Sequence, residues 1–225
     1  MPHVHITKIA NNSPITFKIV GAVMPEIKLP NYKKIAAKVN GEKTEPAEAT
    51  EKEIEETIAE IKKQKPDLKW EDDFKDKIKD GIKKEKEFKA KDKKRMAIIE
   101  KILEDSKITM PKVLVDSELR KMQAQFEDDI ARAGLKVEDY LKHLKKTKED
   151  LAKDWTPDAE KRAKVQLIIT KIALEEKIEA DPEVVKKEVE NLLKIYKDAT
   201  ADRTKAYVEM MLTNEKVFEW LENQK

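Results

Sequence analysis

From Thr50 to the C-terminus, apolar residues return every three or four positions, a spacing typical of amphipathic helices. The chain has only four glycines among 225 residues, which argues against glycine-rich folds such as jelly rolls, propellers and collagen. Charged residues make up 42% of the chain, but 48 basic and 46 acidic side chains leave a net charge of only +2. Charge-driven disorder needs a large net charge and few apolar residues, so the sequence favours long, solvent-rich helices.

Several local signals place these helices along the chain. Thr50 and Glu53 have the spacing of a capping box at the start of the first long helix. The proline-free stretch from about 71 to 105 predicts a helix of about 50 Å, which Gly81 could break. Its apolar stripe includes Met96.

Further signals predict the helices that follow. Pro111 opens a helix that ends near Gly134, and Asp181–Pro182 opens another. Thr147 and Asp150 cap a helix that Pro157 is expected to kink or split. The sequence therefore predicts several amphipathic helices of unequal length, and a final one from about 201.

Residues 1–49 differ from the rest and predict a β or extended leader. Alternation around Phe17 predicts one strand, and Pro25 and Pro30 hold the residues between them extended. Ile35–Val39 is interpreted as another short strand, followed by a turn at Asn40–Gly41. The prediction is a mostly α protein with a leader over 1–49 and a helical domain over 50–225.

Residues that could carry chemistry are few. The chain has no cysteine, no phosphate-cradling loop and no serine in a glycine elbow. His3 and His5 could share one face of a strand, but no third ligand stands at a metal-binding spacing, and His143 is interpreted as solvated. We therefore expect no catalytic residue, no metal and no cofactor. With no apolar run near the length of a bilayer span and no signal sequence, we expect a cytoplasmic chain without a membrane partner.

The most basic segment, Lys83–Arg95, could bind RNA. Acidic residues interrupt it, however, and Glu and Lys at helical spacing stabilise one another, so a solvated helix face is favoured. The net charge of +2 also lacks the strong positive field of a dedicated nucleic-acid binder, and we expect no specific nucleic-acid partner.

Methionine and phenylalanine residues at helical spacing are the candidates for a binding surface. They can pack as helix core, or they can form a soft surface for apolar segments of other proteins, because the thioether of methionine conforms to varied partners. The candidates for contacts to bound polypeptide are Met122, Phe126, Met210, Met211 and Phe218.

Five stretches together resemble bacterial trigger factor, a ribosome-associated folding chaperone. They are PITFKIVGAVMPEIKLPNYKKI at 14–35, KKEKEFKAKDKKRMAIIEKIL at 83–103, PKVLVDSELRKMQAQFEDDIARAGLKVEDYL at 111–141, TPDAEKRAKVQLIITKIALEEKIE at 156–179 and YVEMMLTNEKVFEWL at 207–221. Each alone is a generic pattern, but their order and spacing are specific to the C-terminal chaperone domain and the segment leading into it. The resemblance implies an extended multi-helix domain with long helical arms.

The sequence departs from the family pattern in two places. It contains no Gly-Phe pair of the family's ribosome-binding signature, and residues 1–24 resemble only the end of the ribosome-binding domain. The leader also passes through 50–65 directly to Trp70, which leaves no room for an isomerase insert of the FKBP type. We therefore expect no enzyme, and ribosome binding only if a further N-terminal domain exists.

The resemblance and the residues together favour an ATP-independent chaperone that holds nascent or unfolded polypeptides through apolar patches on helical arms. The alternative is a helical scaffold that docks one defined protein partner, or RNA through Lys83–Arg95. A prolyl isomerase is the third reading and conflicts with the missing insert.

Overall fold

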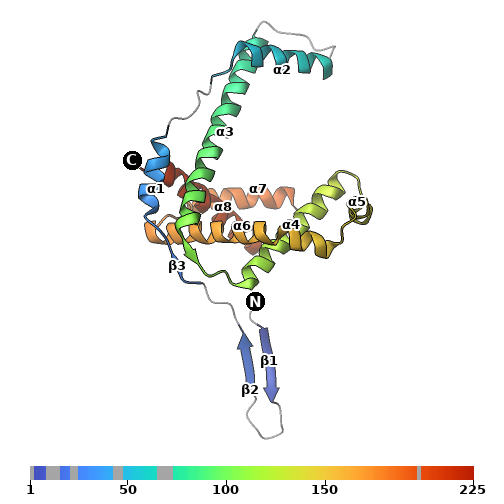
Figure 1. Cartoon of the computed structure of the whole chain (residues 1–225), viewed down its shortest axis with the longest axis vertical. Helices are drawn as coiled ribbons and strands as arrows, with labels where there is room; N and C mark the ends of the chain where they lie inside the picture. The colour runs from blue at the N-terminus through green and yellow to red at the C-terminus, as the bar shows by residue number, and fades with distance from the viewer. Residues whose placement is uncertain (1–2, 9–15, 21–24, 43–47, 65–72, 197–198) are drawn as a thin grey trace. The chain divides into compact units, whose positions relative to one another are not determined.

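The structure is a computed structural model that describes residues 3–8, 16–20, 25–42, 48–64, 73–196 and 199–225. Most of the described residues lie in helices, which confirms the predicted mostly α class (Figure 1). The chain divides into two compact units, each built from two separate stretches of sequence. The first comprises 1–29 and 105–177, and the second comprises 30–104 and 178–225. The boundary predicted between residues 49 and 50 stays a prediction.

In its described residues, the first unit contains two small antiparallel strand pairs and three helices. In chain order its elements are β1 (His3–Lys8), β2 (Thr16–Val20), β3 (Ile27–Lys28), β4 (Lys107–Ile108), α4 (Lys112–Arg132), α5 (Val137–Leu144) and α6 (Lys148–Glu176). The strand β1 pairs with β2, and β3 pairs with β4. The strand β2 confirms the strand predicted around Phe17, and β3 lies in the segment predicted to be extended between Pro25 and Pro30.

Capping residues and glycine set the ends of helices in the first unit. At the start of α6, the backbone N–H of Thr147 donates to the Asp150 carboxylate and the backbone N–H of Asp150 donates to the Thr147 hydroxyl. These two hydrogen bonds form the capping box that the sequence predicts. Gly134 follows α4 with a φ of +73°, a left-handed conformation that costs glycine little. The helix α4 packs against α6, and its Ile130 is buried.

Of the two effects predicted for Pro157, a kink or a split, the split is wrong, because α6 runs unbroken from Lys148 to Glu176, and the kink stays a prediction. Proline lacks the N–H that would bond the carbonyl of Lys153, but both residues lie on the exposed surface, where water can reach that carbonyl. The hydroxyl of Thr156 donates to the carbonyl of Ala152 at 2.8 Å and adds a bond to the neighbouring turn. Further along, Leu167, Ile168, Ile169, Ile172 and Ala173 are buried.

The second unit is entirely helical within the described ranges. Its elements are α1 (Tyr32–Asn40), α2 (Glu51–Gln64), α3 (Phe74–Asp105, whose last residue falls in the first unit), α7 (Pro182–Ile195) and α8 (Ala201–Glu222). The helices α1 and α7 both pack against α8. The predicted starts of α2, α7 and α8 are confirmed, including the capping box of Thr50 and Glu53 and the Asp181 cap beside Pro182.

The interpretation of Ile35–Val39 as a strand is wrong, because these residues form most of α1. The Asn31 side chain accepts from the backbone N–H of Lys34 and caps the helix. Tyr32, Ala36 and Val39 are buried at spacings of four and three, which is the helical period. The run from 35 to 39 alone is too short to separate this period from alternation.

The long helix α3 continues through Gly81 without a break. Its buried positions are Ile78 near the start and Ile98, Ile99 and Ile102 near the end. Met96 is exposed, which contradicts its predicted place in the apolar stripe. Ile98 and Ile102 are four positions apart, about one turn, and Ile99 lies three positions before Ile102. Met96 is two positions before Ile98, a rotation of about 200° around the helix axis, so it lies away from the buried stripe. Trp70 lies outside the described residues.

Candidate functional site

Three apolar side chains of α8 lie exposed at helical spacing. Tyr207, Met210 and Met211, together called the α8 row, are 55%, 38% and 38% exposed. Their neighbour Val208 is fully buried, because one step along a helix turns the side chain by about 100°. Residues three and four apart share a helix face, so the α8 row forms one continuous apolar strip.

Charged residues lie beside the α8 row on the same helix. Lys205 pairs with Glu209 on the same helix at 3.7 Å, with both side chains exposed. Lys216, further along, donates from Nζ to the backbone carbonyl of Glu179 at 2.9 Å. The adjoining helix α7 and the residue after it expose further apolar side chains, namely Val184, Ile195 and Tyr196. The apolar spacing of residues 185–196 predicts Tyr196 on the buried face of its helix, but Tyr196 is exposed because it lies just beyond the end of α7.

Phe218, another predicted contact residue, is covered by the side chain of Arg95. The guanidinium carbon of Arg95 lies 5.2 Å from the centre of the Phe218 ring, an attractive cation–π arrangement. Phe218 is accordingly half-buried, and it is less accessible than the α8 row.

A network of ion pairs holds Arg95 in this position. Its Nη1 and Nη2 atoms donate to the two carboxylate oxygens of Glu215 at 2.9 and 2.7 Å, and its Nε donates to Glu222 at 2.8 Å. The hydrogen bond from Arg95 lowers the pKa of the Glu215 carboxyl. The bonds to Glu215 and then Glu222 raise the pKa of the guanidinium, so Arg95 stays charged. This network fastens α3 to α8.

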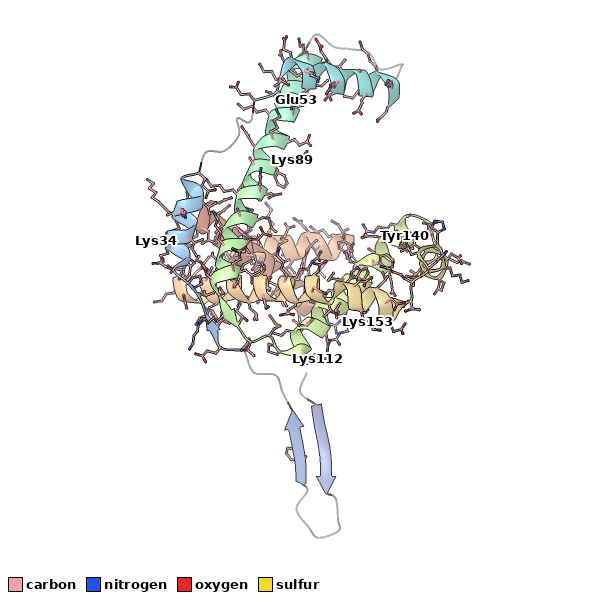
Figure 2. All side chains as sticks on the ribbon, viewed as in Figure 1. Lys34, Glu53, Lys89, Lys112, Tyr140 and Lys153 are labelled. Atoms are coloured by element: carbon pink, nitrogen blue, oxygen red, sulfur yellow. The ribbon has the colours of Figure 1, made fainter. Side chains whose placement is uncertain are left out.

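Met122 and Phe126, the other predicted contact residues, lie half-buried on α4 in the first unit. The Phe126 ring meets Tyr140 of α5 at 5.7 Å and Trp155 of α6 at 5.4 Å between centroids, both edge to face. Figure 2 labels Tyr140 on its short helix. Neither Tyr140 nor Trp155 is among the predicted contact residues, although both are aromatic residues on amphipathic helices.

An open pocket, called the Phe126 pocket, lies beside these rings. Its lining consists of Gln123, Phe126, Glu127, Val137, Lys148, Leu151 and Trp155. The residues come from α4, α5 and α6, so the packing of three helices creates it. At its edge the Nζ atom of Lys148 bonds to a carboxylate oxygen of Glu127 at 2.6 Å.

The five predicted contact residues therefore fall on two separate units. Met122 and Phe126 belong to the first unit, and Met210, Met211 and Phe218 belong to the second. Met210 and Met211 are exposed and the other three are half-buried. Their role in binding stays a prediction.

Several basic side chains of the segment Lys83–Arg95 form ion pairs with acidic side chains of the same protein. Lys86 bonds to Glu53 of α2 at 2.7 Å, and Lys89, labelled in Figure 2, pairs with Glu85 on the same helix. Lys91 lies 3.7 Å from Glu222, whose other partner is Arg95. These contacts support the interpretation of a charged helix surface.

Within the described ranges, no group of three or more His, Asp or Glu side chains is arranged to hold a metal ion. None of the helices in the same ranges combines the length and apolar character that a bilayer span requires. His143 is exposed on α5, as expected.

The fold and these surfaces define a mostly helical protein that presents apolar side chains within a charged surface. Two family models match the chain: bacterial trigger factor protein over residues 1–61, and bacterial trigger factor protein C-terminus over residues 72–225. The chain belongs to the bacterial trigger factor family, as the resemblance of its five stretches indicates.

Individual relatives agree with this family. Trigger factor of Mycoplasma mobile is 32% identical over 161 residues, which cover 69% of this chain and 33% of that protein. Trigger factor of Halalkalibacterium halodurans is 33% identical over 56% of this chain and 29% of that protein, and trigger factor of Trichodesmium erythraeum is 29% identical over 78% and 36%. The chain thus spans about a third of the length of the curated relatives it matches.

One solved structure also aligns, and it concerns promiscuous substrate recognition in folding and assembly activities of the trigger factor chaperone. The alignment covers 99% of this chain and 50% of that chain, with 15% identity and a TM-score of 0.36.

The two family matches leave only residues 62–71 between them. The chain therefore matches the N-terminal and C-terminal parts of trigger factor and not an isomerase domain, as the sequence analysis expects.

Proposed function

We propose that this chain is the polypeptide-holding part of a chaperone of trigger factor type, which binds nascent or unfolded polypeptides without nucleotide. Membership of the trigger factor family supports the general class. The observation that carries the proposal is the α8 row, Tyr207, Met210 and Met211, exposed within a highly charged surface. A cytoplasmic site of action belongs to the same proposal, because nascent polypeptides are made there, and a ribosome contact would require a complete ribosome-binding domain.

The energetics of the α8 row suit holding. Burying the exposed part of each side chain against a bound polypeptide contributes about 1 kcal/mol, since complete burial of such a side chain contributes about 1.5–3 kcal/mol. Three such contacts, opposed by the ordering of the polypeptide, give weak and reversible binding. Release then needs no nucleotide, because the polypeptide dissociates readily and folding removes its apolar side chains from reach.

The charged surroundings fit the same task. Pairs such as Lys205 and Glu209 flank the apolar strip and keep the protein soluble while the strip stays exposed. Methionine side chains adapt to polypeptides of different shape, which a chaperone with many clients needs. Among the five predicted contacts, we place Met210 and Met211 first, because Phe218 lies beneath Arg95.

A substitution experiment tests the proposal. Suppression of light scattering by a denatured client is measured for the parent chain and for the double variant Met210→Ser and Met211→Ser. We expect the double variant to hold the client less well while its helicity and melting temperature remain those of the parent. The matched control is Met96→Ser, which removes an exposed methionine outside the α8 row.

Equal loss in the control and the double variant would show that exposed methionine in general, and not the α8 row, binds the client. Unchanged holding by the double variant would contradict the proposal.

The alternative of a helical scaffold predicts different selectivity. A chaperone of this type binds many unfolded polypeptides and ignores folded ones, whereas a scaffold binds one folded partner. RNA binding through Lys83–Arg95 would instead show an affinity that falls steeply with salt.

A further inference from the structure

The Phe126 pocket lies in the first unit, whereas the α8 row belongs to the second. Its volume is about 140 Å³. A protein cavity of about 150 Å³ lined by Leu, Ile and Phe holds one benzene molecule. The pocket therefore has room for one ring-sized side chain and not for a cluster of them.

The lining favours an aromatic occupant. Phe126 and Trp155 form one wall, and they already meet edge to face with an angle of 70° between their planes. Aromatic rings prefer this arrangement, because the positive edge of one ring faces the negative face of another. Val137 and Leu151 complete the apolar lining, so an entering ring exchanges water for carbon on several sides.

The rim of the pocket carries one donor and one acceptor. Lys148 and Glu127 are about half exposed there and bond to one another. The hydrogen bond to Glu127 raises the pKa of Lys148, with further help from the charges of Glu138 and Glu149, so the ammonium stays charged. An ammonium has three N–H donors and a carboxylate accepts several hydrogen bonds, so each group can bind a second partner.

This pair of opposite charges matches the polarity of a peptide backbone. The Lys148 ammonium can donate to a backbone carbonyl, and the Glu127 carboxylate can accept from a backbone N–H. An extended segment with one ring in the pocket would place both kinds of backbone group at the rim.

We propose that the Phe126 pocket is a socket for a single aromatic side chain, with phenylalanine preferred, from an extended segment of a bound polypeptide. The proposal rests on the function proposed above and adds to it a site that binds one side chain of the polypeptide. A leucine side chain makes fewer contacts with the rings of Phe126 and Trp155 than a phenylalanine does. An alanine side chain leaves the pocket unfilled, and a tryptophan side chain exceeds the volume of the pocket.

The test uses the full chain and a blocked, uncharged nine-residue peptide of glycine, serine and asparagine with one guest residue at its centre. The guest is Phe, Leu, Ala or Trp, and the readout is the indole N–H signal of Trp155 in protein NMR, assigned with a Trp155→Phe variant. We expect the Phe peptide to shift this signal and leave the Trp220 signal in place. The Ala peptide should bind with an affinity at least about tenfold lower, since it does not bury a ring in the pocket.

Filling the pocket with a side chain of the protein should remove the preference for the Phe peptide. Val137→Phe adds a ring to the lining, and Gln123→Phe does so from another helix, which keeps the test decisive if one variant folds poorly. The matched control is Val184→Phe, which adds the same ring at an exposed position of α7. We expect both filled variants, but not the control, to lose the Phe preference.

Equal binding of the Phe and Ala peptides, or retention of the Phe preference in a folded filled variant, would overturn the socket. If the socket fails in this way while the parent chain still suppresses client aggregation, the function proposed above stands. If variants of the α8 row no longer suppress client aggregation, that result bears on the holding function and not on the socket.

Discussion

Replacing Arg95 by methionine tests how strongly α3 is fastened to α8. Methionine keeps an unbranched side chain at this position, where Arg95 is only 12% exposed, but it removes every hydrogen bond to Glu215 and Glu222. Bonds to charged groups contribute about 1.5–3 kcal/mol each, and the pair with half-exposed Glu215 contributes less because water screens it. We therefore expect a loss of about 2–4 kcal/mol in the free energy of unfolding.

The assay is urea unfolding of the full chain followed by far-UV circular dichroism. A double-mutant cycle of Arg95→Met with Glu215→Gln isolates the pair, with an expected coupling of about 1–2 kcal/mol. The control is Lys205→Met, which breaks the exposed pair with Glu209 and should cost less than about 0.5 kcal/mol. A loss for Arg95→Met no larger than for the control would refute the argument.

The same variant has an expected pH dependence. The hydrogen bond from Arg95 lowers the pKa of Glu215 below the ordinary glutamate value of 4.5, so their contact stabilises the folded state above that value. The stabilisation is lost as the pH falls through the lowered pKa of the folded state. The stability difference between parent and Arg95→Met should therefore narrow below about pH 4.

Other predictions concern glycine positions and one helix cap. Gly81→Ala should raise stability by about 0.5–1 kcal/mol, because its helical site is open, whereas Gly134→Ala should cost about 1–2 kcal/mol at a φ of +73°. Thermal melting checks both, and shifts of equal sign would contradict the assignment. The pKa of Glu53 is lowered to about 2, first by the hydrogen bond from Lys86 and then by Thr50, so its contacts stabilise the fold above 4.5 and are lost as the pH falls towards 2. A carboxyl titration by NMR should show this value, and Thr50→Val should raise it.

Local signals in the sequence were sufficient for most helix boundaries. Thr147 with Asp150 and Asp181 with Pro182 start helices through bonds between close neighbours, so the chain folds there as its local chemistry directs. The strand predicted for Ile35–Val39 is wrong because the helical pattern becomes visible only with Tyr32, which lies before that run.

Long-range pairing had no comparable signal. The strand β3 pairs with β4 through Ile27 and Ile108, far apart in the sequence, and each strand is only two residues long. Such a short segment carries no readable alternation, so its partner could not be predicted.

The site was predictable in part. The sequence identifies Met210 and Phe218 as apolar residues on one helix, but it does not reveal that Arg95 of a distant helix covers only the second. The Phe126 pocket likewise requires three helices to meet, and Trp155 becomes part of it only through their packing. Exposure is a property of the assembled fold, and a helical pattern alone leaves it open.

The central claim is that unfolded polypeptides bind through apolar contacts, and the salt dependence of binding tests it most directly. The affinity of the full chain for a denatured, non-aggregating client is measured at low and at high salt. Apolar contacts predict an affinity that stays level or rises with salt, because salt does not screen them and excluded salts strengthen burial. A steep fall in affinity at moderate salt would show that the contacts are ionic and would contradict the account.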